Sequence, residues 1–260
     1  MKALAARRRH PAAILLILLL GLVATGGLYS VLAPKPALAA VAAADEVAAG
    51  KKLFLANCAT CHGINAEGSD TVPTLAGVGA AAVDFQVGTG RMPMAGPGVQ
   101  AAPSDKVKFS DEQIAALGAY VASLGPGPSV PDDQYTKGDG DIAKGNELFK
   151  VNCAMCHNFA GSGGALTRGK YAPNLRNVSG KHIYEAMVTG PQSMPVFNEN
   201  NLSPSDKNDI ISYLHELDKD KNPGGMNLGN LGPVSEGMFI WIFGLGFVIA
   251  GAVWVGAKGK

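Results

Sequence analysis

Residues 58–62 of this sequence read CATCH, and residues 153–157 read CAMCH. The chain has four cysteines, and these two short stretches contain all of them. The surrounding residues also correspond, because GKKLFLANCATCHG at 50–63 resembles GNELFKVNCAMCHN at 145–158. The sequence therefore contains a tandem repeat, and each copy contains one Cys-x-x-Cys-His motif.

Cys-x-x-Cys-His is the attachment signature of c-type haem. Two thiols bond to the vinyl groups of the porphyrin, and the adjacent histidine binds the iron. We therefore predict two covalently bound haem c groups. The predicted attachment cysteines and iron-binding histidines are Cys58, Cys61 and His62 in the first repeat, and Cys153, Cys156 and His157 in the second.

Three other uses of a Cys-x-x-Cys pair fit the sequence less well. A thioredoxin-like site expects a single motif beside a βαβ pattern, which is not visible here. A shared zinc site would use the four cysteines and leave the histidines without a role. A disulfide framework, possible in an exported protein, would not explain why a histidine follows each pair.

The candidates for the sixth iron ligand can be reduced by elimination. Between residues 34 and 140 the only histidine is His62, so the candidates in the first repeat are Met92 and Met94. A Met-Pro pair recurs in step with the haem motif, which favours Met92 in the first repeat and Met194 in the second. The second repeat also offers three further candidates, which are His182, His215 and Met187.

A proline follows each haem histidine in a Pro-x-Leu loop, at Pro73 and at Pro173. A histidine that binds a metal commonly donates its other ring N–H to a neighbouring acceptor, which fixes the orientation of the ring. A carbonyl near each loop is therefore a candidate acceptor for the free N–H of the haem histidine.

The predicted fold class is all-α. Helices are expected before each Cys-x-x-Cys-His motif and at the end of each repeat, with glycine- and proline-rich loops between them. Ser110 and Gln113 read as a capping box, and Ser203 before Pro204 reads as an N-cap with proline at the first helical position. The predicted domains are an N-terminal basic and apolar segment at 1–40, a first haem domain at 45–125, a linker at 126–140, a second haem domain at 141–221, a tether at 222–237 and a transmembrane helix at 238–257.

Two uncharged apolar segments, at 12–33 and 238–257, are each about as long as the roughly 20 residues that a membrane-spanning helix needs. Basic residues before the first and after the second place both ends in the cytoplasm, with the haem domains on the other side. The first segment also fits a cleaved signal peptide, because it is followed by Ala-Leu-Ala at 37–39. Both alternatives export the haem domains. The formal net charge of +1 gives no indication of nucleic-acid binding.

Each repeat resembles a class I cytochrome c domain. The whole chain resembles more specifically the dihaem cytochrome c subunit of the actinobacterial cytochrome bcc complex, a menaquinol–cytochrome c reductase. The stretches that carry this resemblance are QVGTGRMP at 86–93, CAMCHNFAGSGGAL at 153–166, GKYAPNL at 169–175 and TGPQSMP at 189–195.

The resemblance implies a place in a respiratory chain in the plasma membrane. The Rieske iron–sulfur protein, which oxidises menaquinol together with cytochrome b, would supply electrons. The first haem domain would pass them to the second, and the second to the copper-centre subunit of a terminal oxidase. The implied axial ligands are His62 with Met92 and His157 with Met194. The subunit would then belong to an enzyme without having a substrate site of its own.

Two other functions use the same motifs. A free-standing, membrane-anchored dihaem carrier would serve other dehydrogenases or reductases and would have no stable cytochrome b partner. A haem-based sensor would need an open or exchangeable sixth position at the iron. A visible spectrum of the reduced protein with and without carbon monoxide would distinguish it. A peroxidase would need one open haem, and the two matched Met-Pro loops argue against that function.

Overall fold

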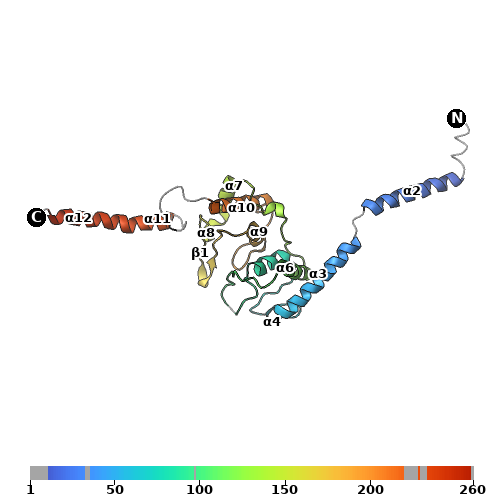
Figure 1. Cartoon of the computed structure of the whole chain (residues 1–260), viewed down its shortest axis with the longest axis horizontal. Coiled ribbons are helices and arrows are strands. Elements are labelled where there is room, and N and C mark those ends of the chain that lie inside the picture. Colours follow the sequence, from blue (N-terminus) through green and yellow to red (C-terminus); the bar gives the residue numbers. More distant parts are fainter. Residues whose placement is uncertain (1–10, 33–35, 97, 220–227, 229–232, 259–260) are drawn as a thin grey trace, which may run out of the picture. The chain divides into compact units, whose positions relative to one another are not determined.

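The computed structural model describes residues 11–32, 36–96, 98–219, 228 and 233–258. The chain divides into two units, Met1–Asp45 and Glu46–Lys260. The first unit contains the apolar helix α2 (Pro11–Leu32) and the beginning of α3 (Pro36–Asn57) (Figure 1). The second unit contains both repeats and the C-terminal helix. The basic residues before α2, and most of the predicted tether at 222–237, lie outside the described residues.

The first repeat is built from the end of α3 and three further helices, which are α4 (Ala59–His62), α5 (Gly79–Gly88) and α6 (Asp111–Ala122). Gly50 lets α3 cross closely over α6, since a Cβ atom there would lie 1.9 Å from the carbonyl oxygen of Ala116. One turn further on, the ring of the buried Phe54 packs at 5.2 Å from that of Tyr120. Phe54 and Tyr120 both belong to the first hydrophobic core.

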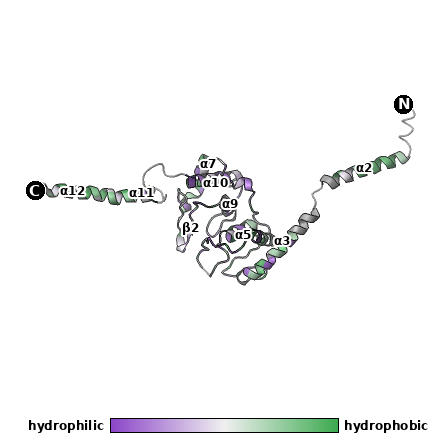
Figure 2. Ribbon diagram, in the orientation of Figure 1, coloured by the Kyte–Doolittle hydropathy of each residue, from purple (hydrophilic) through white to green (hydrophobic). Residues whose placement is uncertain are grey.

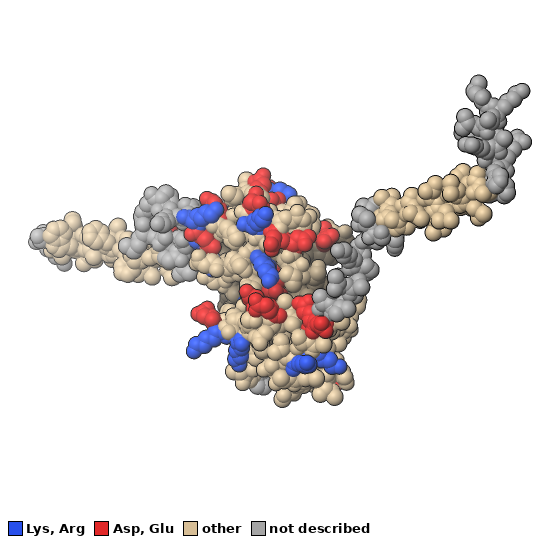
Figure 3. Space-filling view, turned by 45° about the vertical axis from the view of Figure 1, so that its right-hand side comes forward, with Lys and Arg blue, Asp and Glu red and all other residues tan. Residues whose placement is uncertain are grey.

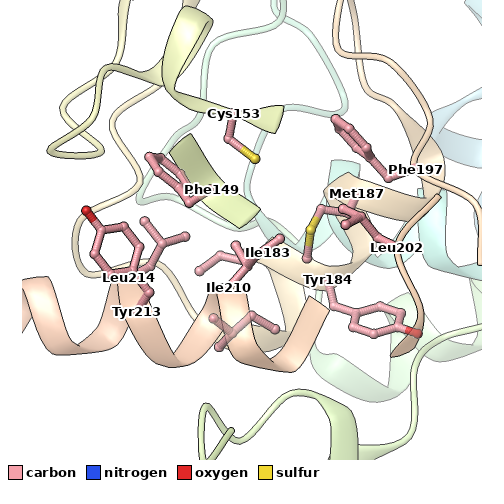
Figure 4. Packing of buried hydrophobic residues seen from close by; sticks show 11 residues of the cluster. Phe149, Cys153, Ile183, Tyr184, Met187, Phe197, Leu202, Ile210, Tyr213 and Leu214 are labelled. Atoms are coloured by element: carbon pink, nitrogen blue, oxygen red, sulfur yellow. The ribbon is translucent and has the colours of Figure 1, made fainter. Parts of the chain in front are cut away.

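The second repeat forms the same crossing with α7 (Ile142–Asn152) and α10 (Pro204–Lys219). A Cβ atom at Gly145 would lie 1.9 Å from the carbonyl oxygen of Asp209. The ring centroids of Phe149 and Tyr213 are 5.4 Å apart. Figure 4 shows Phe149, Tyr213 and the other buried side chains of this core, together with Cys153. The internal repeat therefore encodes one helix crossing twice.

The remaining elements of the second repeat are α8 (Ala154–His157), α9 (Gly180–Thr189), the 3₁₀ turn η2 (Thr167–Gly169) and two short strands. Strands β1 (Gly164–Ala165) and β2 (Tyr171–Ala172) pair antiparallel, with Gly164 opposite Ala172. The fold is mostly helical, as the sequence predicts.

The helix boundaries at the end of each repeat follow from their capping residues. Ser110 and Gln113 form the predicted capping box, with hydrogen bonds of 3.4 and 3.0 Å. At α10, the hydroxyl of Ser203 accepts from the backbone N–H of Asp206 at 3.2 Å, and the Asp206 carboxylate accepts from the N–H of Ser203 at 2.9 Å. Both predicted helix starts are confirmed.

Helices α5 and α9 lie where the sequence analysis expects only loops, and this part of the prediction is wrong. The physical reason is visible for α5, which packs against α6 and also against α9 of the other repeat. Its buried residues are Gly79, Ala81, Val83, Phe85 and Val87. A helix covered on two sides does not show the single apolar stripe by which an amphipathic helix is found.

The two haem-motif repeats are in direct contact. Besides the packing of α5 on α9, the side-chain amide of Gln100 pairs with the backbone of Tyr171, donating at 2.8 Å and accepting at 2.9 Å. Lys181 Nζ lies 2.6 Å from Asp84 Oδ2. The segment predicted as a linker also packs, because the Pro128 carbonyl accepts from the Ala81 N–H at 3.1 Å. It includes the 3₁₀ turn η1 (Asp133–Tyr135).

The C-terminal segment consists of α11 (Pro233–Phe239), a π-helical stretch η4 (Ile240–Leu245) and α12 (Gly246–Lys258). Together they give an apolar helix of 24 residues, Val234–Ala257, that is long enough to cross a membrane and is not buried (Figure 2). It begins earlier than predicted, so the last residues of the predicted tether are helical. The N-terminal apolar helix is shorter, Ala12–Leu28.

Candidate haem sites

Each Cys-x-x-Cys-His motif occupies a helical turn that directly follows α3 in the first repeat and α7 in the second. In the first repeat, the N–H of Cys58 donates to the Phe54 carbonyl at 2.8 Å, and that of His62 to the Cys58 carbonyl at 2.9 Å. Cys153 and His157 make the corresponding bonds, also at 2.8 and 2.9 Å. Helical spacing places the two cysteines of each motif on one face. Neither pair of cysteines forms a disulfide.

Each haem histidine is held through its Nδ1 atom. Nδ1 of His62 lies 3.0 Å from the carbonyl oxygen of Pro73, and Nδ1 of His157 lies 3.0 Å from that of Pro173. A carbonyl can only accept, so the hydrogen bond requires the proton on Nδ1 and leaves the lone pair on Nε2 for a metal. The prediction that these proline loops hold the histidines is confirmed.

Burial strengthens this arrangement in the second repeat. His157 is buried, and burial lowers the pKa of its imidazole, while the hydrogen bond to Pro173 partly offsets the effect. A neutral imidazole is the form that binds iron.

A cavity of about 650 Å³ adjoins the second motif. Cys153, Cys156, His157 and Met194 all line it, as does Pro173. Its volume is in the range of a small-molecule or cofactor site. The two thiols and the imidazole needed for covalent haem therefore share one cavity with a thioether, and this donor set fits haem c.

The other candidate ligands of the second repeat are divided between the cavity and its surroundings. Met187 and His182 line the cavity with Met194. His215 does not, and its Nε2 lies 3.3 Å from the Val178 carbonyl oxygen. In the first repeat, Met92 is partly buried against the hydrophobic core, whereas Met94 is among the exposed apolar side chains.

The first repeat also lines the cavity of the second, which the sequence analysis did not predict. Phe85, Thr89, Arg91 and Gln100 all border it. The Arg91 guanidinium lies over the Phe85 ring, 4.6 Å from its centroid, and burial lowers its pKa. No periodicity or motif in the sequence indicates which residues of one repeat reach the other, because this depends on how the two domains pack.

Acidic and basic side chains are intermixed on the face of the haem domains shown in Figure 3. A carrier that finds its partners by electrostatic steering depends on fields of one sign over a surface. The mixed pattern gives no indication of such a patch on this face.

Fold and motifs together define a protein with two tandem c-type cytochrome domains, and their four motif cysteines fit two covalently bound haem c groups. Residues 47–125 match the family described as Cytochrome c. Residues 140–214 match the family described as Cytochrome C oxidase, cbb3-type, subunit III.

Curated relatives give the more specific family. The chain is 46% identical over 256 residues to the "Cytochrome bc1 complex cytochrome c subunit" of Mycobacterium leprae, covering 94% of this chain and 87% of that protein. The protein of the same name from Mycobacterium tuberculosis strain H37Rv is 46% identical, with 97% and 92% covered. That from Corynebacterium diphtheriae is 42% identical, with 99% and 98% covered. The chain belongs to the family of cytochrome c subunits of the cytochrome bc1 complex.

Proposed function

We propose that this subunit carries electrons from the Rieske iron–sulfur protein to a terminal cytochrome c oxidase, through the first and then the second haem domain. It would do so as part of a menaquinol-oxidising complex and would have no substrate site of its own. Haem c supplies one-electron chemistry at its iron. The observation that best supports the proposal is the full-length similarity to named subunits of this complex.

We propose His62 with Met92, and His157 with Met194, as the axial ligands. Support comes from the two Nδ1–carbonyl contacts, which orient both imidazoles in the same way. It also comes from the presence of Met194 in the second cavity and from the burial of Met92, which contrasts with exposed Met94. With two protein ligands, each iron would have no open site for a substrate, and a thioether ligand raises the potential.

Direct contact between the two haem domains supports a relay within the chain. Helices α5 and α9 pack together, and Arg91 of the first domain borders the cavity of the second. Domains held together in this way do not need to find each other by diffusion. We assign the domains to 45–125 and 141–221, on the outer side of the plasma membrane.

The C-terminal helix is long and apolar enough to anchor the chain in the membrane, and its composition suits docking on a specific partner. Its glycines include Gly244, Gly246 and Gly251, and small residues let helices approach closely in lipid. We propose that Val234–Ala257 docks on the cytochrome b subunit.

Replacement of residues 238–257 by an unrelated membrane-spanning helix tests this proposal. Cytochrome b and the Rieske protein should co-purify with the wild-type chain after mild detergent extraction. They should be lost from the chimera, together with quinol-driven haem reduction, while both haems stay attached. Retention of both proteins and of full activity by the chimera would show a generic anchor. Failure of the wild-type chain to co-purify with cytochrome b would indicate a free-standing dihaem carrier instead.

A further inference from the structure

Three potential metal ligands meet at the contact between the two haem domains. They are Asp84 on α5 of the first domain, and His182 and Glu185 on α9 of the second. One ligand atom from each lies within 4.8 Å of the other two. His182 and Glu185 are three residues apart in the helix, so they lie on the same face of α9.

Glu185 is the unusual member of this group. Its side chain is fully buried, at 0% exposure, and neither carboxylate oxygen has a hydrogen-bond partner among the described residues. A buried ionised carboxylate without a partner is costly, and such groups are usually paired or bound to a metal. The adjacent Asp84 carboxyl can share a hydrogen bond with Glu185 only if one of the two acids holds a proton.

The neighbouring ion pair uses only one oxygen of Asp84, so the other oxygen can bind a cation. Lys181 pairs with one oxygen of Asp84, Oδ2, at 2.6 Å. The other oxygen, Oδ1, faces His182, whose Nε2 is 3.8 Å away. Burial lowers the pKa of His182, with the Lys181 and Arg91 cations acting in the same direction and Asp84 against it. A neutral imidazole can bind a metal through its lone pair.

We propose that Asp84, His182 and Glu185 bind a zinc ion that joins the two haem domains. One imidazole and two carboxylates form a ligand set that zinc accepts, whereas magnesium and calcium prefer oxygen ligands alone. Zinc–ligand bonds of about 2.0–2.2 Å require the three ligand atoms to close to about 3.4 Å from one another, with water in the fourth position. The side chains of Asp84 and His182 are 16% and 24% exposed, so an ion can reach the site from solvent.

Two properties of the site support this assignment. Burial, reinforced by the nearby Asp84, raises the pKa of Glu185 to about 8, although Lys181 acts in the opposite direction. Zinc binding would displace the proton of Glu185, and the dication would then compensate both carboxylates, of which only Asp84 is paired with Lys181. Because the ligands come from both domains, the ion would stabilise their contact as well as each fold.

The test is a zinc titration of the full chain in detergent, with both haems attached and without an affinity tag. Attached haem keeps the four cysteines from competing for zinc. After treatment with EDTA and desalting, zinc chloride is titrated by calorimetry, and bound zinc is measured after gel filtration. We expect one zinc ion per wild-type chain. Glu185→Gln and His182→Gln should each weaken binding by at least about tenfold.

Glu147→Gln makes the same chemical change at an exposed position of α7 and should bind zinc as the wild type does. Zinc should also raise the thermal unfolding midpoint of the wild type and of this control, but not those of the other two variants. Absence of zinc from the wild-type chain after gel filtration would overturn the proposal. The proposal would also be overturned if Glu185→Gln and His182→Gln, with intact haem spectra, bound zinc as tightly as the wild type.

Discussion

Gly50→Ala is a sharp test of the helix crossing that organises each haem domain. The new Cβ atom would lie 1.9 Å from the carbonyl oxygen of Ala116 and 2.9 Å from Cβ of Tyr120. The closest atom belongs to the backbone of α6 and cannot rotate away. The two helices must separate by about 1.1 Å to bring this contact to the 3.0 Å limit of real Cβ contacts.

The expected cost combines three terms. Overpacking of a well-packed core costs about 1–3 kcal/mol. Loosening of the Phe54–Tyr120 ring pair, now at 5.2 Å, removes up to about 1 kcal/mol. Replacing glycine by alanine inside a helix returns about 0.5–1 kcal/mol. The net destabilisation is therefore about 2 kcal/mol, equivalent to a fall of roughly 10 °C in the thermal midpoint of a domain of this size.

Gly118→Ala is the matched control in the same domain. Its Cβ atom would make an ordinary contact, 3.5 Å from Cβ of Ala80, so this variant should gain about 0.5–1 kcal/mol from helix propensity. Thermal denaturation of the haem-loaded chain, followed by circular dichroism, compares the two variants, and intact mass confirms that both haems are attached. A Gly50→Ala protein as stable as Gly118→Ala would refute the crossing.

Three further predictions concern the haem sites and the domain contact. Met92→Ala and Met194→Ala should each convert one haem to high spin or to another ligand, with a lower reduction potential. Met94→Ala should leave the methionine–iron absorption band unchanged. Loss of that band in Met94→Ala alone would show that Met94, and not Met92, binds the first haem iron. Phe149→Ala, at a site with 0% exposure, should lower stability by about 3–5 kcal/mol in denaturant titrations, and Phe149→Leu should cost far less. In EDTA, folded Glu185 keeps its proton up to about pH 8, whereas the unfolded chain loses this proton near pH 4.5. The free energy of unfolding should therefore fall as the pH rises from 4.5 to about 8. Glu185→Gln should flatten this fall, and an unchanged pH dependence in that variant would exclude the raised pKa.

Much of each haem site follows directly from the sequence. A Cys-x-x-Cys-His motif specifies both thiols and the imidazole within a single helical turn. The Pro-x-Leu loops supply the carbonyl oxygens that hold His62 and His157, because the loop after each motif leads back over the haem histidine. Ser110 and Ser203 define helix starts by local hydrogen bonds alone. These features depend on residues close to one another in the chain.

Features that depend on distant residues are missing from the sequence analysis. Helix α5 is covered by both α6 and α9, so its apolar residues form no single stripe. His182 is one of several candidate haem ligands in the sequence, and only the fold shows that it faces Asp84 of the other domain. The choice among methionines remains a prediction based on the repeat, supported by the burial of Met92 and by the position of Met194 in the cavity.

The most direct test of the electron path is menaquinol-driven reduction of the second haem in a complex whose first domain cannot attach haem. Cys58→Ser with Cys61→Ser removes the first haem, and Cys153→Ser with Cys156→Ser serves as the converse variant. If electrons pass from the first domain to the second, the second haem of the former should stay oxidised with menaquinol but become reduced with dithionite. The first haem of the converse variant should still be reduced by menaquinol. Reduction of the second haem by menaquinol at the wild-type rate, without the first haem, would contradict the relay.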